Sequence, residues 1–124
     1  IMDSSSVENI KITKVAIIQF PNNSIIPDNS ADSVLEEIVK FKNEKKIRLV
    51  GHTSKTGSET IEGKRINMEI SISRAQTIKN MLINKGFDGN NIEVFGKGDL
   101  EPLQEAEEFG EAVNRRVEVF FISY

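Results

Sequence analysis

Short apolar runs alternate along this chain with segments of helical periodicity, and this order constrains the fold more than any other feature. The expected elements are, in chain order, a strand over 11–20, a helix after residues 28–30, a strand over 47–50, a helix from 71 to 86, a strand over 92–95, a weak acidic helix over 104–113 and a strand over 116–122. Helices that alternate with strands bury their apolar sides against a sheet. The order therefore predicts a two-layer α/β sandwich, in which a four-stranded mixed sheet carries its helices on one face.

The two stronger helices have recognisable start and stop signals. Ser33 and Glu36 have the spacing of a capping box at the first helix. Ser71 is expected to be the N-cap of the second helix, and Gly86 is expected to end it. Residues 52–69, which precede the second helix, contain few large aliphatic side chains and are predicted to form a long polar loop.

Length and composition limit the chain to one domain. The 124 residues suffice for a single core, which we expect over 11–124 after a flexible, polar lead-in of residues 1–10. The net charge of −3 and the pI of about 5.3 exclude a general affinity for nucleic acid, because such binders carry a basic face. The absence of cysteine excludes disulfides and thiolate chemistry. The start at Ile1-Met2 indicates a fragment, so we expect any export signal or membrane anchor to lie outside it.

The residue types of an active site or a metal centre do not come together in this sequence. His52 is the only histidine, and its spacing identifies neither a nucleophile nor an orienting carboxylate. A structural role for His52 in its loop is therefore favoured over catalysis. One histidine without cysteine is too few ligands for zinc, and Gly96-Lys97-Gly98 lacks the spacing of a phosphate-binding loop. We expect neither an enzyme nor a bound metal or cofactor.

An arginine near the expected start of the second helix is the strongest candidate for ligand binding. Arg74 would oppose the helix dipole there, so its position contributes little to helix stability. Together with Ser71 and the free N–H groups of the helix start, Arg74 could bind both oxygens of a carboxylate. The competing interpretation is an ordinary solvated arginine. At the final strand, Arg115 and Arg116 point to opposite faces, so one can face a ligand groove while the other faces solvent.

Five separated motifs occur in one recognisable order. They are Phe20 with Asn23-Ser24 and Pro27, then Gly51-His52-Thr53, then Asn67-x-x-Ile70-Ser71-x-x-Arg74-Ala75, then Gly96-x-Gly98 with Glu101-Pro102, and finally Asn114-Arg115-Arg116-Val117-Glu118. Taken together, these motifs resemble the OmpA-like peptidoglycan-binding domain over about residues 12–122. That family includes the tails of outer-membrane porins, peptidoglycan-associated lipoproteins and flagellar stator anchors.

The resemblance implies a binding module rather than an enzyme. The implied partner is the stem peptide of peptidoglycan, recognised chiefly through the side-chain ammonium and carboxylate of its meso-diaminopimelate residue. By similarity, Arg74 binds that carboxylate. The other ligand-binding residues implied by the resemblance are Asn23, Thr53, Ser54, Asn67, Ser71, Asn114 and Arg115. The implied location is the periplasm of a Gram-negative bacterium, where the module anchors a membrane-associated parent protein of the outer membrane or cell envelope to the cell wall.

The sequence departs from the family pattern at the residue that follows Gly-His-Thr. The family has an aspartate there, which meets the ligand ammonium, whereas this chain has Ser54. A hydroxyl brings no charge, so we expect weaker binding unless another acid substitutes. Glu59 and Glu62 are two candidates, although an ordinary solvated loop is the favoured interpretation for their segment. The alternative function is a protein-interaction domain that kept the fold and lost diaminopimelate recognition.

Overall fold

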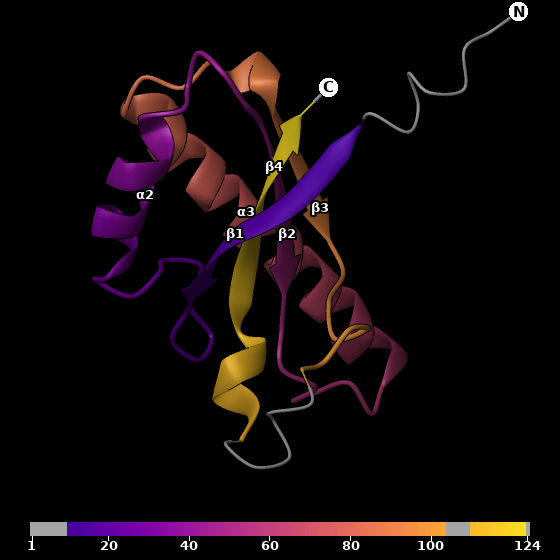
Figure 1. Ribbon diagram of the computed structural model, residues 1–124. Helices are drawn as coiled ribbons and strands as arrows, with labels where there is room; N and C mark the ends of the chain where they lie inside the picture. The colour runs from indigo at the N-terminus through magenta and orange to yellow at the C-terminus, as the bar shows by residue number, and fades with distance from the viewer. Residues whose placement is uncertain (1–9, 104–109, 124) are drawn as a thin grey trace, which may run out of the picture.

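The computed structural model describes residues 10–103 and 110–123, and it confirms the predicted α/β architecture (Figure 1). Its elements are β1 (Lys11–Gln19), α2 (Ala31–Val39), β2 (Lys46–His52), α3 (Ile61–Asn84), η1 (Gly89–Asn91), β3 (Ile92–Gly96), η2 (Glu111–Asn114) and β4 (Arg116–Ser123). The strands form one sheet in the order β1-β4-β2-β3. The sheet is mixed, because β2 and β3 are parallel whereas β4 is antiparallel to both of its neighbours.

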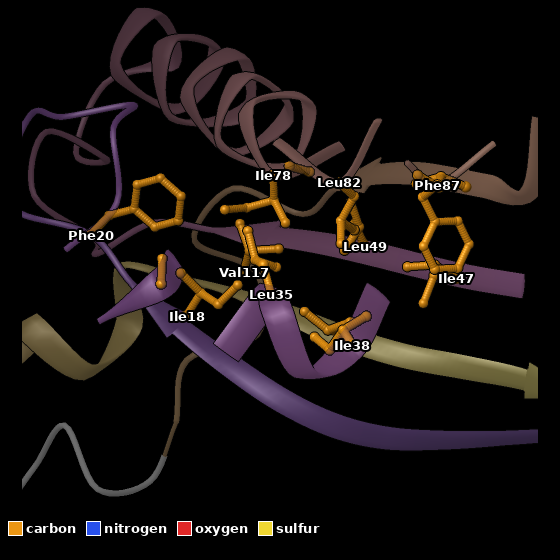
Figure 2. Packing of buried hydrophobic residues seen from close by; sticks show 14 residues of the cluster. Ile18, Phe20, Leu35, Ile38, Ile47, Leu49, Ile78, Leu82, Phe87 and Val117 are labelled. Atoms are coloured by element: carbon orange, nitrogen blue, oxygen red, sulfur yellow. The ribbon is translucent and has the colours of Figure 1, made fainter. Parts of the chain in front are cut away.

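The hydrophobic core lies between the two α-helices and one face of the sheet (Figure 2). The sheet contributes fully buried side chains such as Leu49 on β2 and Val117 and Val119 on β4. The helices contribute Leu35 on α2 and Ile78 on α3, which are also fully buried. Burial of each such side chain stabilises the fold by roughly 1.5–3 kcal/mol. This shared core therefore holds both helices on the same face of the sheet.

Helix α3 begins well before Ser71, so the predicted long loop is wrong over its second half. The N-cap is Thr60, whose side chain accepts a hydrogen bond from a backbone N–H of the first turn at 2.9 Å. The first turns carry charged side chains, and Arg65 forms ion pairs with Glu62 and Glu69. Apolar spacing did not predict this part of the helix, because ion pairs between side chains one turn apart stabilise it instead. No described helix, α3 included, is long and apolar enough to cross a lipid bilayer.

The capping box predicted for the first helix is also wrong. Helix α2 starts before Ser33, whose hydroxyl donates a hydrogen bond to a carbonyl of the preceding turn at 3.0 Å. Glu36 accepts a hydrogen bond from Lys85, just after α3, at 2.6 Å, so it connects the two helices. The predicted end of the second helix is confirmed. Gly86 follows the last residues of α3 with a φ of 111°, a conformation that favours glycine.

The remaining predicted elements are mostly confirmed. Strand β2 extends beyond the predicted 47–50 at both ends, and β3 and β4 lie where the sequence placed them. Within the weak helix predicted over 104–113, residues 104–109 lie outside the described residues. The described part is the 3₁₀ helix η2, which follows Gly110 and leads almost directly into β4.

Candidate functional site

A small cavity lies at one end of the sheet, where the ends of β1 and β2 meet the start of β4. Gln19 at the end of β1 and His52 at the end of β2 both pair with Arg116 at the start of β4. The cavity, here called the Arg74 pocket, has a volume of about 40 Å³. It is lined by Asn22, Asn23, Thr53, Ser54, Thr56, Asn67, Ile70, Arg74 and Arg115. One water molecule needs a cavity of roughly 10–15 Å³. The larger volume of this pocket is therefore enough for a group about the size of a carboxylate.

The structure brings six of the eight predicted ligand-binding residues to this pocket. They are Asn23, Thr53, Ser54, Asn67, Arg74 and Arg115. Sequence reasoning missed Asn22, Thr56 and Ile70, which also line the pocket. Two of these had a local signal, because Asn22 belongs to the turn that follows the first strand and Ile70 lies one helical turn before Arg74.

The other two predicted residues, Ser71 and Asn114, are buried beside the pocket and do not line it. The Ser71 hydroxyl donates to the carbonyl of Met68 at 2.7 Å and accepts from the N–H of Gly98 at 2.9 Å. Ser71 lies in the middle of α3, so its prediction as an N-cap is wrong. Asn114 Oδ1 accepts a hydrogen bond from the N–H of Leu103 at 2.7 Å. Both side chains fix the loops around the pocket.

Two glycines allow α3 to approach the sheet closely enough for Arg74 to reach the strand ends. A Cβ atom at Gly51 on β2 would lie 1.8 Å from the carbonyl oxygen of Ser71. A Cβ atom at Gly96 on β3 would lie 2.4 Å from the Cγ1 of Ile72. Both distances are far shorter than a van der Waals contact, so only glycine permits this approach. The packing of these two strands therefore sets the position of Arg74, one turn further along the helix.

Arg74 is buried, and its guanidinium connects two loops of the pocket. Its Nε donates to the carbonyl of Ser24 at 2.9 Å, its Nη1 to that of His52 at 3.0 Å, and its Nη2 to that of Pro21 at 3.4 Å. Only 2% of the residue is exposed, so the interpretation of Arg74 as a solvated surface arginine is wrong. The prediction that the free N–H groups of a helix start contribute to this site is also wrong, because α3 begins after Thr60, far from Arg74.

The turn after β1 points two of these carbonyls toward Arg74. Asn23 has a φ of 55°, in the left-handed region that asparagine tolerates better than most residues. The Ser24 hydroxyl accepts a hydrogen bond from the N–H of Ile26 at 2.9 Å and closes the turn. The ring of Phe20, just before the turn, has its centroid 5.3 Å from the Cζ of Arg74. This contact is close enough for a favourable cation–π interaction.

The charge of Arg74 has no counter-ion among the described residues. All three of its hydrogen bonds go to backbone carbonyls. Burial, followed by the nearby charge of Arg115, lowers the pKa of Arg74 to about 10, so the guanidinium stays protonated at neutral pH. Three of the five guanidinium N–H donors are used by these bonds, which leaves donors for a ligand. A buried cation with unused donors is suited to bind an anion.

Neutral polar atoms complete the lining of the pocket. Asn67 Nδ2 donates to the carbonyl of Thr56 at 3.1 Å and to the hydroxyl of Ser58 at 2.8 Å. Because a carbonyl can only accept, the amide nitrogen must be the atom that faces Thr56, and the amide oxygen remains available as an acceptor. The buried hydroxyl of Thr53 has no hydrogen-bond partner within the described structure.

The second arginine of the final strand does not face solvent, contrary to prediction. Arg116 is 2% exposed, and its Nε donates to Oε2 of Glu118 at 3.1 Å. The Glu118 carboxylate also lies 3.2 Å from the Nε2 of His52 and 3.0 Å from the Nζ of Lys14. Burial alone would raise the pKa of Glu118, but the hydrogen bond from Lys14 and the charge of Arg116 outweigh it and lower the pKa. Arg115, the other arginine of the pair, lines the pocket.

His52 is a structural residue, as the sequence favoured, although its ring contacts a side chain rather than its own loop. The residue is 1% exposed, and its ring pairs with Glu118. Burial, followed by the charge of Arg116, lowers the pKa of His52 below its ordinary value of 6.5 despite the opposing effect of Glu118. The ring is therefore neutral at neutral pH, while the backbone carbonyl of His52 accepts a hydrogen bond from Arg74.

The acidic residues proposed as substitutes for the family aspartate lie in solvent. Glu62 is exposed and pairs with Arg65, and Glu59 is exposed just before α3. Neither residue lines the Arg74 pocket, which agrees with the favoured interpretation of their segment. Within residues 10–103 and 110–123, no three histidine, cysteine, aspartate or glutamate side chains form a group that could hold a metal ion.

The fold and the pocket define a small α/β module with a buried arginine beside a cavity at the strand ends. The sequence pattern of the OmpA family matches residues 19–116, and the chain belongs to the OmpA family. Domains of this family are binding and anchoring modules rather than enzymes, and this holds for the present chain.

Proteins of similar sequence occur in several bacteria. Peptidoglycan-binding protein ArfA of Mycobacterium tuberculosis is 32% identical over 106 residues, which covers 82% of this chain and 31% of ArfA. The probable lipoprotein YiaD of Escherichia coli is 28% identical over 113 residues, with coverage of 83% and 49%. Outer membrane protein A of Bordetella avium is 42% identical over 73 residues, with coverage of 56% and 34%. The chain thus spans about a third to a half of the length of these relatives.

Solved structures share the fold at lower identity. The peptidoglycan-associated lipoprotein of Burkholderia pseudomallei matches with a TM-score of 0.76 at 19% identity, over 86% of this chain and 90% of that one. The OmpA-like domain of FopA1 from Francisella tularensis gives a TM-score of 0.76 at 21% identity, with coverage of 86% and 70%. The C-terminal domain of Helicobacter pylori MotB gives 0.69 at 21%, with coverage of 86% and 84%. At these identities the likeness establishes the fold.

Proposed function

We propose that this chain binds peptidoglycan non-covalently, through the meso-diaminopimelate residue of the stem peptide. Membership of the OmpA family and similarity to a relative named peptidoglycan-binding protein support a cell-wall ligand. The observation that carries the proposal is Arg74, a buried guanidinium with unused donors, no described counter-ion and a carboxylate-sized cavity beside it. Such a cation requires an anion that arrives with the ligand.

In this proposal the side-chain carboxylate of diaminopimelate binds the free N–H groups of Arg74, and the charge of Arg115 adds to the attraction. Each charge-assisted hydrogen bond contributes roughly 1.5–3 kcal/mol. Three backbone carbonyls already hold the guanidinium in place, so little side-chain entropy is lost when the ligand binds. The remainder of the peptide lies outside the small cavity.

The position of the pocket suits an anchoring module. Lys11 pairs with Ser123 at one end of the sheet, whereas Gln19 pairs with Arg116 at the pocket end. Figure 1 shows both ends of the described chain at the end of the sheet opposite to the start of β4. A parent protein attached at those ends leaves the pocket open to the cell wall. We therefore place the module in the periplasm, with a parent protein in the cell envelope, and relatives named as outer membrane protein and lipoprotein support this placement.

A second candidate function is a protein-interaction domain that no longer recognises diaminopimelate. The observation that favours it is the neutral character of the pocket around Ser54. Thr53, Ser54 and Asn67 offer hydroxyl and amide groups, and no acidic residue belongs to the described lining. An ammonium group would find no charged partner among them.

Retention on purified sacculi tests the proposed function. The chain should sediment with sacculi, and Arg74→Lys should reduce its affinity by about tenfold or more, because a point charge cannot reproduce the bidentate fork. Arg48→Lys is the matched control, since Arg48 pairs with Glu93 and does not line the pocket. Circular dichroism establishes that each variant is folded before its retention is compared.

The two candidate functions give different results in this assay. Failure of the folded wild-type chain to sediment would contradict peptidoglycan binding and favour the protein-interaction domain. Equal retention of the wild type, Arg74→Lys and Arg48→Lys would place the cell-wall contact somewhere other than the Arg74 pocket.

A further inference from the structure

The ligand ammonium needs a carboxylate, and most described acids around the pocket are already paired with cations. Asp99 lies 3.5 Å from the Nζ of Lys64. Glu101 lies 2.8 Å from the Nζ of Lys97, and Glu118 belongs to the buried cluster behind the pocket. These charges are neutralised locally, so none of them replaces the aspartate of the family pattern.

Glu111, on the 3₁₀ helix η2, is the exception. Its Oε1 accepts a hydrogen bond from the backbone N–H of Lys55 at 2.8 Å, and its Oε2 accepts one from Asn114 Nδ2 at 3.2 Å. Neither contact comes from a cationic side chain, and Glu111 forms no ion pair within the described structure. The N–H of Lys55 belongs to the peptide bond that links Lys55 to Ser54, and Ser54 lines the pocket. The Glu111 carboxylate is therefore hydrogen-bonded to the backbone directly beside the pocket.

We propose that Glu111 supplies the negative charge for the ligand ammonium that Ser54 lacks, an inference that rests on the proposed function. A carboxylate has about four lone-pair sites, so the two existing hydrogen bonds leave capacity for a ligand. Those bonds also fix its orientation before the ligand arrives. Glu111 thus adds a negative charge to a site that already has the cations Arg74 and Arg115, and the presence of both signs suits a zwitterionic side chain.

Direct contact between Glu111 and the ammonium is not required for this effect. The Ser54 hydroxyl and the amide oxygen of Asn67 provide neutral acceptors in the lining, and an opposite charge still favours an ammonium over about 4–6 Å. Sequence reasoning missed Glu111 because it considered only Glu59 and Glu62, the acids of the segment shortly after Ser54. The fold instead brings Glu111 to Lys55 from the segment before β4.

The test is the substitution Glu111→Gln, measured by calorimetry with two peptides. The first is a diaminopimelate stem peptide with a free side-chain amine, and the second carries an acetyl group on that amine. The glutamine amide oxygen can still accept the hydrogen bond from Lys55, but the amide nitrogen cannot accept the one from Asn114 Nδ2. The acetylated peptide therefore controls for this local structural change. We expect Glu111→Gln to bind the free-amine peptide about five- to tenfold more weakly and the acetylated peptide with unchanged affinity.

Two further variants separate charge from structure. Ser54→Asp in the Glu111→Gln background restores the charge from the position used by the family and should recover the affinity for the free-amine peptide. Glu59→Gln removes an exposed acid that does not line the pocket, and it should leave both affinities unchanged.

The possible outcomes are distinguishable. Equal weakening toward both peptides in Glu111→Gln would mean that Glu111 only supports the turn, which overturns the inference. Equal wild-type affinity for the two peptides would also overturn it, because no charge would then recognise the ammonium. Failure of the wild type to bind either peptide would instead contradict the proposed function itself.

Discussion

Arg74 has an observed structural role and a proposed role in ligand binding, and both depend on the same guanidinium. Its three hydrogen bonds to backbone carbonyls join the turn after β1 to the end of β2, and the residue also lines the pocket. A residue that is 2% exposed cannot be removed without a cost to the fold. Loss of ligand binding in an Arg74 variant therefore has to be separated from loss of stability.

We predict that Arg74→Met lowers the free energy of unfolding by about 2–4 kcal/mol, because three carbonyls lose their donor in a mostly buried site. Urea denaturation measures the change. Arg48→Met serves as the control, since its partly exposed ion pair with Glu93 should contribute no more than about 1 kcal/mol. Equal losses in the two variants would contradict the structural role assigned to Arg74.

His52 gives a prediction about pH. Its pKa is lowered from 6.5 in the folded state, so below pH 6.5 the unfolded chain binds a proton that the folded chain resists. Stability should therefore fall as the pH decreases from 6.5 toward about 5.5, above the ordinary carboxyl pKa of 4.5 near which the lowered pKa of Glu118 begins to matter. In His52→Gln this slope should be much smaller. Urea midpoints across that pH range provide the measurement, and an unchanged slope in the variant would contradict the buried neutral imidazole.

At this scale the sequence pointed to residues that the fold brings together, but it did not predict their surroundings. The motif around Arg74 was recognisable, and six of the eight implied residues line one pocket. The burial of Arg74 could not be predicted, because it depends on the carbonyls of Pro21 and Ser24, about fifty positions earlier in the chain. Glu111 was missed for the same reason, since its contact with Lys55 is created only by the fold.

At the scale of elements, the contact between α3 and the strand ends decides whether the pocket exists. Gly51 and Gly96 let the helix backbone approach two neighbouring parallel strands. The Ser71 hydroxyl stabilises the same region, because it accepts a hydrogen bond from the N–H of Gly98. The helix thereby places Arg74 and Asn67 on the pocket side.

We predict that Gly51→Ala destabilises the chain by about 3 kcal/mol or more, because its methyl group would meet the backbone of Ser71 and push the helix away. Gly89→Ala is the matched control. There the nearest atom is the flexible end of Ile83 at 3.1 Å, so the change should stay within about 1 kcal/mol. Thermal unfolding compares the two variants, and similar melting temperatures would show that the close approach at Gly51 is not needed.

The elements themselves were predictable to different degrees. The strands follow from apolar runs. In β4 the apolar Val117 and Val119 alternate with polar neighbours that are buried as well. The start of α3 was not predictable from apolar spacing, because the ion pairs of Arg65 support it. The capping box at Ser33 failed because the spacing of two residue types does not fix where a helix begins.

At the scale of the whole molecule, the antiparallel pairing of β1 with β4 separates the pocket from the ends of the described chain. Residues 11 and 123 lie at one end of the sheet, and the Arg74 pocket lies at the other. Both helices cover one face of the sheet, so the strand ends remain free to form a site. This geometry supports the proposed function, in which the module is attached at one end and binds the cell wall at the other.

The central claim is that the Arg74 pocket reads the side-chain carboxylate of diaminopimelate, and calorimetric titration with two stem peptides tests it most directly. One peptide contains meso-diaminopimelate, and the other contains lysine, which lacks only that carboxylate. We predict that the lysine peptide binds at least about tenfold more weakly, because Arg74 then keeps its unpaired charge. Equal affinities for the two peptides would contradict the claim.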